Sequence, residues 1–474
     1  MGENRDMRRR DFLAGAAAAG FGALTANALG QSTASAKQLA RIPERKGKSV
    51  AGLRHKPMEK VRVAVIGVGA RGSGHVVQLA AIEGVEVKAI CDLYKDWADN
   101  AAANVVKAGQ PAPTLYVGDP YAYKEMMKRD DIDAVFIATP WQWHTPMALC
   151  AMQNGKHAFT EVPAALTLDE CWALVDTAEE TQLHCMMMEN VNYGREELMV
   201  LNMVRMGALG ELLHGEAAYI HDLRGQMHEE QRGTGSWRTL EYMSRNGNLY
   251  PTHGLGPVSQ YMDICRGDRF DFLSSVSCNS RMREIYAREN FPEGHKWRRG
   301  KFVCGDLNTS IIRTVKGRTV MVQWDEQLPR PYTRHNLIQG TKGCWGGFPD
   351  RLTIEGKYKT AEGKVVGTED WMENGDLDKV YAEFDHPLYK KQGELAKKMG
   401  GHGGMDFLML WRIIYCLRNG EPLDQNVYES VSWSAVTPLS EYSVANRGAS
   451  VDFPDFTRGS WKTDKPLGIV DPKV

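Results

Sequence analysis

A set of glycines follows the first strongly apolar run of the chain. Gly67, Gly69 and Gly72 form a G-x-G-x-x-G pattern after the Val/Ile-rich run 61–66, and Asp92 lies twenty residues beyond Gly72. Such glycines allow a tight turn and bring a pyrophosphate close to a helix N-terminus, where free N–H groups favour an anion. A carboxylate at this spacing accepts hydrogen bonds from a ribose diol and repels a 2′-phosphate. The spacing therefore predicts a dinucleotide site that favours NAD over NADP.

Three further loops carry polar or aromatic side chains. Trp141–His144, Glu161 and Asn190 each come soon after a short apolar run. Because the carboxyl ends of parallel strands meet at one edge of a sheet, we expect these loops to converge on the same ligand. They complete the predicted cofactor site.

The stretch YPTHG at 250–254 carries the best candidates for proton transfer. Histidine titrates near neutrality and serves as acid or base, and a tyrosine relays a proton or binds a hydroxyl. We expect a loop here, stiffened by its proline and freed by its glycine, in which a histidine taken by itself is more often structural than catalytic. His221 and His402 are weaker candidates for the same pocket. We predict no metal site.

Alternating elements must position the cofactor residues. Short β-branched runs are separated by segments of helical length, and this spacing predicts a doubly wound parallel sheet, a Rossmann domain over residues 60–189. The predicted strands are Val61–Ile66, Val85–Ile90, Ala134–Ala138, His157–Phe159 and Cys185–Met188, and the clearest helices are Gly74–Glu83 and Asp96–Lys107.

The sequence texture changes near Asn190. Longer alternating runs, at 212–223, 270–287, 308–328 and 335–348, are typical of antiparallel strands with one solvated face. A large, open, mostly antiparallel sheet with helices such as 405–420 behind it predicts a second, α+β domain over residues 190–445, which would bind the substrate. We expect residues 37–59 to form an arm or linker and residues 446–474 a C-terminal tail.

Composition and charge narrow the class of ligand. The 474 residues are 43% hydrophobic and 25% charged, with a formal net charge of −1. This balance is typical of a globular protein with two or three domains. Without a sustained basic patch, nucleic acid and anionic membrane are poor partners. A small, near-neutral ligand is favoured.

The first residues are predicted to be a targeting segment. Three arginines at 8–10, then Asp11-Phe12-Leu13, lead into an Ala/Gly-rich run too weakly apolar to span a membrane, which resembles a twin-arginine export signal over residues 1–36. The nine cysteines include no CxxC pair, so we expect buried free thiols. Folding in the reducing cytoplasm before export to the periplasm accommodates both features.

The motifs GVGARG, ICD, ATPWQWH and TEVPAA resemble the Gfo/Idh/MocA oxidoreductase superfamily over nearly the whole mature chain. Within it, the sequence is most similar to glycoside hydrolase family 109, whose known activity is that of an NAD-dependent α-N-acetylgalactosaminidase. The resemblance implies NAD contacts from Ala70, Arg71, Asp92, Trp141, Gln142, Trp143, His144, Glu161, Val162, Asn190 and Tyr250. It implies sugar contacts from Tyr219, Arg238, Tyr250, Pro251, Thr252, His253 and Tyr332. Gln142 stands where many members have glutamate.

The resemblance also implies an unusual hydrolysis. Direct hydrolysis needs two carboxylates flanking the glycosidic bond, and we find no pair with comparable sequence context. In the implied scheme, NAD⁺ oxidises C3 of the sugar, a base removes the acidified C2 proton, and the C1 group is eliminated. Water then adds and the retained NADH restores C3. The scheme needs a proton acceptor near the sugar, and because the residues flanking His253 match the family, the resemblance implies His253 and Tyr250 as the catalytic pair. We expect an exported carbohydrate-active enzyme, and we expect the open sheet to be the surface through which copies pair if the enzyme is a homo-oligomer.

Two alternatives remain open at this stage. The first is a net sugar oxidoreductase or transhydrogenase of the superfamily. Such enzymes usually carry a lysine where this chain has Val162, so Val162 argues against this alternative. The second is a noncatalytic sugar-binding protein. The matching sugar positions argue against it.

Overall fold

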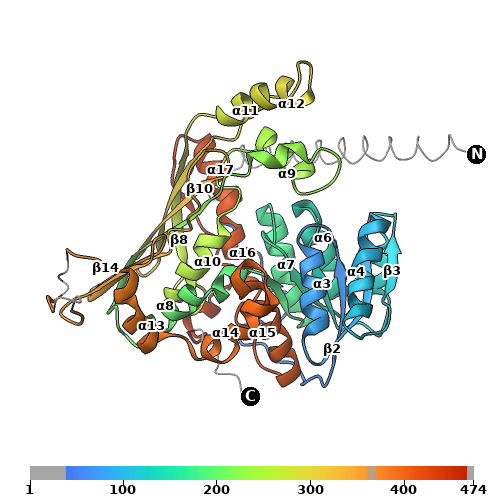
Figure 1. Ribbon diagram of the computed structural model, residues 1–474, viewed down its shortest axis with the longest axis horizontal. Helices are drawn as coiled ribbons and strands as arrows, with labels where there is room; N and C mark the ends of the chain where they lie inside the picture. The colour runs from blue at the N-terminus through green and yellow to red at the C-terminus, as the bar shows by residue number, and fades with distance from the viewer. Residues whose placement is uncertain (1–38, 360–362, 366, 368, 467–474) are drawn as a thin grey trace, which may run out of the picture.

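The computed structural model describes residues 39–359, 363–365, 367 and 369–466, so the predicted export signal lies outside the described residues. Figure 1 shows a parallel sheet with its helices on the right and a large sheet, seen nearly edge-on, on the left. Between them lie the helices α8 (Arg195–Arg205), α10 (Thr252–Tyr261), α15 (Met405–Asn419) and α16 (Val427–Ser434). The predicted combination of a Rossmann domain with a second mixed domain is confirmed.

The N-terminal sheet is parallel and six-stranded, in the order β3-β2-β1-β4-β5-β6. Its strands are β1 (Val61–Ile66), β2 (Val85–Asp92), β3 (Thr114–Val117), β4 (Ala134–Ile137), β5 (His157–Thr160) and β6 (Cys185–Met187). Its helices are α3 (Gly72–Ala81), α4 (Lys95–Lys107), α5 (Tyr123–Met127), α6 (His144–Gln153) and α7 (Leu168–Thr181). The strand order reverses between β1 and β4, which creates the crevice where ligands bind in such sheets.

The predicted strands of this domain are confirmed, and β3 is the one that sequence patterning missed. β1 and β4 are almost wholly buried, because helices cover both faces of a parallel sheet, and they read as continuous apolar runs. β3 lies at the edge and none of its residues is buried, so it carries no comparable signal.

The second sheet is nine-stranded, in the order β14-β13-β12-β11-β7-β10-β9-β8-β15. Its strands are β7 (Leu212–Ile220), β8 (Phe270–Ser277), β9 (Asn308–Thr314), β10 (Thr319–Asp325), β11 (Leu337–Gly340), β12 (Gly343–Gly346), β13 (Arg351–Ile354), β14 (Met372–Glu373) and β15 (Val451–Asp452). The remaining helices are α9 (Gly235–Ser244), α11 (Met282–Asn290), α12 (Lys296–Arg299), α13 (Asp378–Phe384), α14 (Pro387–Met399) and α17 (Val436–Ala445).

Two details of the second domain differ from the simple antiparallel expectation. β7 and β10 pair in parallel at the centre of the sheet, since the chain between them forms α9, α10, β8 and β9 before it returns. The run 270–287 is a strand only in its first half, and α11 begins at Met282. The other strand pairs of this sheet are antiparallel.

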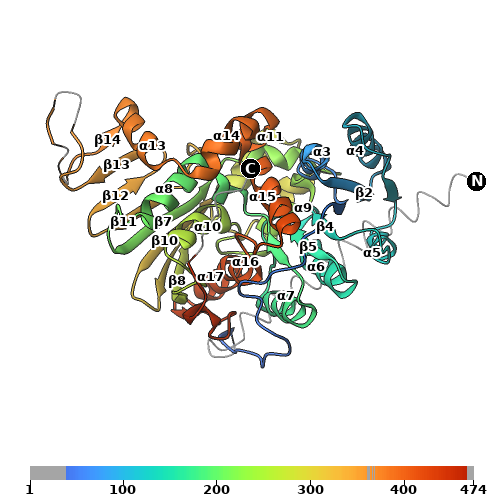
Figure 2. The same ribbon diagram turned by 90° about the horizontal axis from the view of Figure 1, so that it is seen from below.

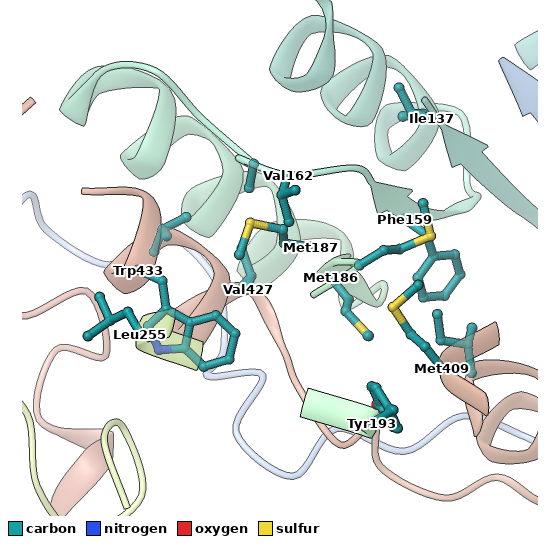
Figure 3. Close-up of a cluster of buried hydrophobic side chains, with 14 of the residues drawn as sticks. Ile137, Phe159, Val162, Met186, Met187, Tyr193, Leu255, Met409, Val427 and Trp433 are labelled. Atoms are coloured by element: carbon teal, nitrogen blue, oxygen red, sulfur yellow. The ribbon is translucent and has the colours of Figure 1, made fainter. Parts of the chain in front are cut away.

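One apolar cluster joins the two domains. Figure 3 shows Val162 and Met187 from the Rossmann side close to Trp433 of α16 and Leu255 of α10. All four side chains are buried, with at most 4% of their surface exposed. The methionine run at β6 is therefore core, and its packing fixes α10 against the carboxyl edge of the parallel sheet.

The arm and the C-terminal segment are packed together. Arg45 donates to the Thr457 carbonyl at 2.7 Å, and Ser49 lies 3.1 Å from the Tyr428 hydroxyl. Figure 2 shows the arm, in blue, passing α7 and α16 toward the red C-terminal segment. β15 pairs with β8, so the described part of residues 446–474 is integrated into the large sheet and differs from the tail that we expected.

Over the described ranges, no helix has both the length and the apolar character needed to cross a bilayer.

Candidate active site

The glycine turn after β1 has the geometry that its spacing predicts. Gly67 has φ 79°, and a Cβ added there would lie 2.6 Å from the Ala138 carbonyl oxygen. A Cβ at Gly72, the first residue of α3, would lie 1.8 Å from the Gly67 oxygen, and one at Gly69 would lie 2.7 Å from the Trp97 ring. Only glycine fits at these positions, so the backbone at the start of α3 stays open to a pyrophosphate.

Asp92 ends β2 at the same edge. One carboxylate oxygen accepts from the Val68 N–H and the other from the Tyr94 N–H, each at 2.7 Å. Burial raises the pKa of Asp92, and these two backbone hydrogen bonds oppose the rise. Each oxygen keeps a second lone pair, which suits a ribose diol.

Arg71 lies between two buried carboxylates. Its Nε donates to Glu161 at 2.7 Å and its Nη1 to Asp406 at 2.5 Å. Asp406 also accepts from the Asn190 amide at 2.6 Å, and His75 bonds Glu161 at 2.6 Å. Although burial opposes ionisation, Arg71 and its neighbours lower the pKa of both carboxyls well below the usual range. Glu161 is thus a fixed anion and not a proton acceptor.

Asp406 is a site residue that sequence reasoning missed. It stands at the start of α15, after a Gly-rich run in which Gly401, Gly403 and Gly404 have positive φ. His402, from the same run, places Nδ1 2.8 Å from an Asp406 carboxylate oxygen. The concentration of glycines at 400–404 was the one sequence feature that marked this segment. It did not reveal the partner of Asp406, because Arg71 is 335 residues away in the chain.

The segment Trp141–His144 forms a short 3-10 turn leading into α6. His144 bonds the carbonyls of Thr139 and Pro163 at 2.8 and 2.7 Å, so it holds two loops of the sheet edge together. Trp141 is buried, Gln142 is exposed and Trp143 is half-buried.

The prediction of a loop at 250–254 is wrong. Pro251 caps α10, whose first residue is Thr252, so His253 lies in the first helical turn. Gly254 is within the helix, and a Cβ there would lie 2.2 Å from the Ala218 backbone nitrogen. The glycine therefore allows α10 to contact β7 closely, which holds His253 on a rigid element.

His253 is paired with a carboxylate that the sequence did not reveal. Its Nδ1 donates to Glu189 Oε1 at 2.6 Å, and the Glu189 side chain is fully buried. Glu189 follows β6 and comes directly before Asn190, in the run MMMEN. The apolar methionines marked a core strand, and the carboxylate that follows them was passed over. This Glu189–His253 pair leaves Nε2 of the imidazole available.

The predicted sugar residues gather around His253. Ring centroids lie 4.9 Å apart for Tyr250 and His253, 5.1 Å for Tyr219 and His253, and 4.8 Å for Tyr219 and Tyr250. The Tyr219 hydroxyl forms a hydrogen bond with His221 Nδ1 at 2.9 Å. The ring centroid of Tyr332 lies 6.2 Å from that of Tyr219. Burial raises the pKa of Tyr250 and of Tyr219 well above its usual range, so both phenols are hydrogen-bond donors.

Arg238 closes one wall of this group. Its guanidinium lies 5.0 Å from the Trp141 ring and 5.3 Å from the Tyr250 ring, and it pairs with buried Glu326 at 3.4 Å. Glu326 also accepts from the Tyr242 hydroxyl. Trp141, predicted to contact the cofactor, and Tyr250, predicted to contact the sugar, thus share one wall, so the two predicted sites lie side by side.

The chain matches two family models. Residues 193–463 match the model described as "Glycosyl hydrolase 109, C-terminal domain", and residues 61–189 match the "Oxidoreductase family, NAD-binding Rossmann fold". The chain is 57% identical over 465 residues to a "Glycosyl hydrolase family 109 protein" of Shewanella putrefaciens, covering 98% of this chain and 99% of that protein. It is 57% identical over 466 residues to an "Alpha-N-acetylgalactosaminidase" of Shewanella oneidensis, with the same coverage.

Solved structures share the fold at low identity. A levoglucosan dehydrogenase in complex with NADH aligns with a TM-score of 0.62 at 18% identity, covering 83% of this chain and 99% of that one. A scyllo-inositol dehydrogenase of Lactobacillus casei with bound NAD(H) and scyllo-inositol aligns with a TM-score of 0.57 at 13% identity, with the same coverage. Taken with the glycine turn, Asp92 and the residues around His253, these matches show that the chain belongs to glycosyl hydrolase family 109, as an NAD-dependent glycoside hydrolase.

Proposed function

We propose that this enzyme hydrolyses terminal α-N-acetylgalactosaminides by transient oxidation at C3 and elimination across the C1–C2 bond, with NAD retained between turnovers. The Shewanella oneidensis relative carries that activity in its name. The sugar residues predicted from the family lie around one histidine beside the cofactor edge. The proposal extends that arrangement to substrate and mechanism.

The residues present fit NAD. The glycine turn would be filled by any Cβ, and Asp92 lies at the end of β2 where a ribose diol is recognised. Asn190 is buried at the same edge, and its side-chain oxygen has no hydrogen-bond partner in the protein. An unsatisfied buried acceptor indicates a missing donor, which a bound cofactor can supply. When bound, NAD supplies reversible oxidation of a sugar hydroxyl, which acidifies the neighbouring C–H.

The Glu189–His253 pair is the observation that carries the proposal. Glu189 fixes the imidazole orientation through Nδ1 and stabilises the cation that forms when Nε2 takes a proton. His253 is therefore the base for the C2 proton. Tyr250 stays neutral because burial raises its pKa, so it donates a hydrogen bond to a sugar oxygen and does not act as the base.

The other carboxylates around the site are committed to partners. Among the described residues there, Glu161 and Asp406 bind Arg71, and Glu326 binds Arg238 and Tyr242. Direct hydrolysis needs one carboxyl group that donates a proton and a second that attacks or activates water. Carboxylates held by arginines are poor at both roles, which favours elimination.

Two measurements on an aryl α-N-acetylgalactosaminide test the proposal. With a 4-nitrophenyl glycoside, we expect release of nitrophenolate without accumulation of NADH, which absorbs at 340 nm. We also expect a deuterium at C2 of the sugar to exchange into solvent. Complete retention of the C2 deuterium in the product would contradict the elimination route. Stoichiometric NADH without cleavage would instead support a net sugar oxidoreductase.

The side chain of Val162 favours the glycosidase over a net sugar oxidoreductase. It is 4% exposed and packs in the apolar cluster with Met187 (Figure 3). A buried aliphatic group at this position cannot move a proton. Proton transfer is then left to His253, with Tyr250 as a hydrogen-bond donor to the sugar.

We also propose export through the twin-arginine route. The described structure contains nine free cysteines, of which six are buried, and such thiols suit folding in a reducing compartment. Replacing Arg9 and Arg10 together by lysine should retain the protein in the cytoplasm in a fractionation assay. Unchanged periplasmic location of that variant would overturn this part of the proposal.

A further inference from the structure

A continuous row of aromatic rings leads from the cofactor edge to the protein surface. Successive ring centroids are 5.9 Å apart from Trp141 to Tyr250, 4.8 Å from Tyr250 to Tyr219, 6.2 Å from Tyr219 to Tyr332 and 5.7 Å from Tyr332 to Phe348. The first three rings are buried. Tyr332 is 41% exposed and Phe348 is 38% exposed. The outer two rings therefore present apolar surface directly next to the sugar site.

The two outer rings are held in place from below. The guanidinium of Arg334 lies 4.8 Å from the Phe348 ring and 5.6 Å from the Tyr332 ring, and it donates to the Tyr332 hydroxyl at 2.9 Å. Arg334 is itself buried and fixed by Glu197 at 2.6 Å. Burying a charged pair is unfavourable unless the geometry of the pair is well defined. Because Arg334 is held in this way and contacts both rings, it keeps the two rings in a fixed orientation.

The backbone also keeps Phe348 in an unusual conformation. Its φ is 58°, in the left-handed region that non-glycine residues avoid. The preceding Gly347 N–H donates to the His335 carbonyl at 3.1 Å, which ties this turn to the segment after Tyr332. Backbone strain of this kind collects at ligand-contact sites.

We infer that Tyr332 and Phe348 form a binding platform for the leaving group, and that this group is a second sugar ring. The inference rests on the proposed function, because it places the cleaved residue at Tyr219, Tyr250 and His253. A pyranose offers a C–H face that packs on aromatic rings and hydroxyls that suit a polar surround. The two exposed rings and the Tyr332 hydroxyl at the edge of one of them match that mixture. The favoured substrates are then glycans, and simple alkyl glycosides are poorer.

Phe348→Ala removes the outermost ring, and two substrates test its role. One is a disaccharide with N-acetylgalactosamine α-linked to a second hexose, and the other is the methyl α-glycoside, which has no second ring. We expect kcat/KM to fall about three- to tenfold for the disaccharide. For the methyl glycoside it should stay within twofold. Phe348→Tyr keeps a ring and should restore the difference. Equal losses on both substrates, or no loss on either, would overturn the platform.

Trp371→Ala is the matched control, since Trp371 is an equally exposed aromatic residue, at 41%, next to β14 of the same sheet. It should change neither value. Binding measured by calorimetry separates this inference from the proposed function. If neither glycoside is hydrolysed, the proposed function fails. The platform still stands if Phe348→Ala weakens disaccharide binding several-fold and leaves methyl glycoside binding unchanged, and it falls if both affinities respond alike.

Discussion

Replacing Glu189 by glutamine isolates the contribution of the Glu189–His253 pair. Glutamine keeps the size of the side chain and an oxygen that accepts from Nδ1, but it removes the negative charge 2.6 Å from the imidazole. With charge centres about 4 Å apart and an effective dielectric constant of about 20, a carboxylate stabilises an imidazolium by about 4 kcal/mol. Since 1.36 kcal/mol is a factor of ten in rate, this is about a thousandfold. Both side chains are largely buried, so solvent screens the interaction weakly.

We expect the Glu189→Gln enzyme to lose about two to three orders of magnitude in kcat on an aryl glycoside, with a much smaller change in KM. Exchange of the C2 deuterium should slow in parallel, because that step creates the imidazolium. Bound NAD, measured after release from the purified protein, should stay at the wild-type amount.

Glu230 provides a matched control. It accepts from His295 Nε2 at 2.9 Å, so it also forms a carboxylate–histidine pair, but its charged neighbours are His295 and Lys296 and not the residues around His253. Glu230→Gln should leave kcat within about twofold, as expected of a half-exposed pair. The reasoning is refuted if Glu189→Gln retains more than about a third of kcat with its NAD content intact.

Three further predictions test the cofactor site and the core. Asp92→Asn should weaken NAD binding at least tenfold and reduce discrimination against NADP, as measured by cofactor titration of the stripped protein. Gly72→Ala should yield little cofactor-loaded protein and a lower melting temperature, because its Cβ would lie 1.8 Å from the Gly67 oxygen. Burial lowers the pKa of His157 from 6.5 to about 3, so only the unfolded chain takes up this proton as pH falls below 6.5. Through this group alone, the free energy of unfolding at pH 4.5 should be about 2–3 kcal/mol lower than at pH 7, and His157→Gln should remove that share in urea titrations. Buried His184, whose pKa burial also lowers, adds a loss in the same direction that should remain in this variant.

Local sequence patterns predicted most of the proposed cofactor site. The G-x-G-x-x-G turn, Asp92 and the parallel strands are specified by residues close together in sequence, because a tight turn and a βαβ unit depend on local spacing. Similarly, the apolar run of β1 is a direct consequence of burial on both faces. β3 escaped detection because an edge strand with no buried residue has no such pattern.

The stretch at 250–254 shows where local reading fails. Proline and glycine favour a loop in isolation, but proline also suits a helix start, and Gly254 is required by the approach of β7. That approach is a tertiary contact, invisible in five residues. The consequence is functional, since His253 lies on a rigid helix and not on a flexible loop.

By itself, the sequence determined the Rossmann domain and NAD as the cofactor, and its resemblance to the family predicted the residues around the sugar. Only the tertiary structure decided their partners. Glu189 meets His253 across 64 positions, and Arg71 meets Asp406 across 335. Such pairs form because strands, loops and helices from distant parts of the chain meet at one sheet edge, where buried charges must find counter-charges. No local spacing encodes these pairings, and the Glu189–His253 pairing is the observation on which we propose His253 as the base.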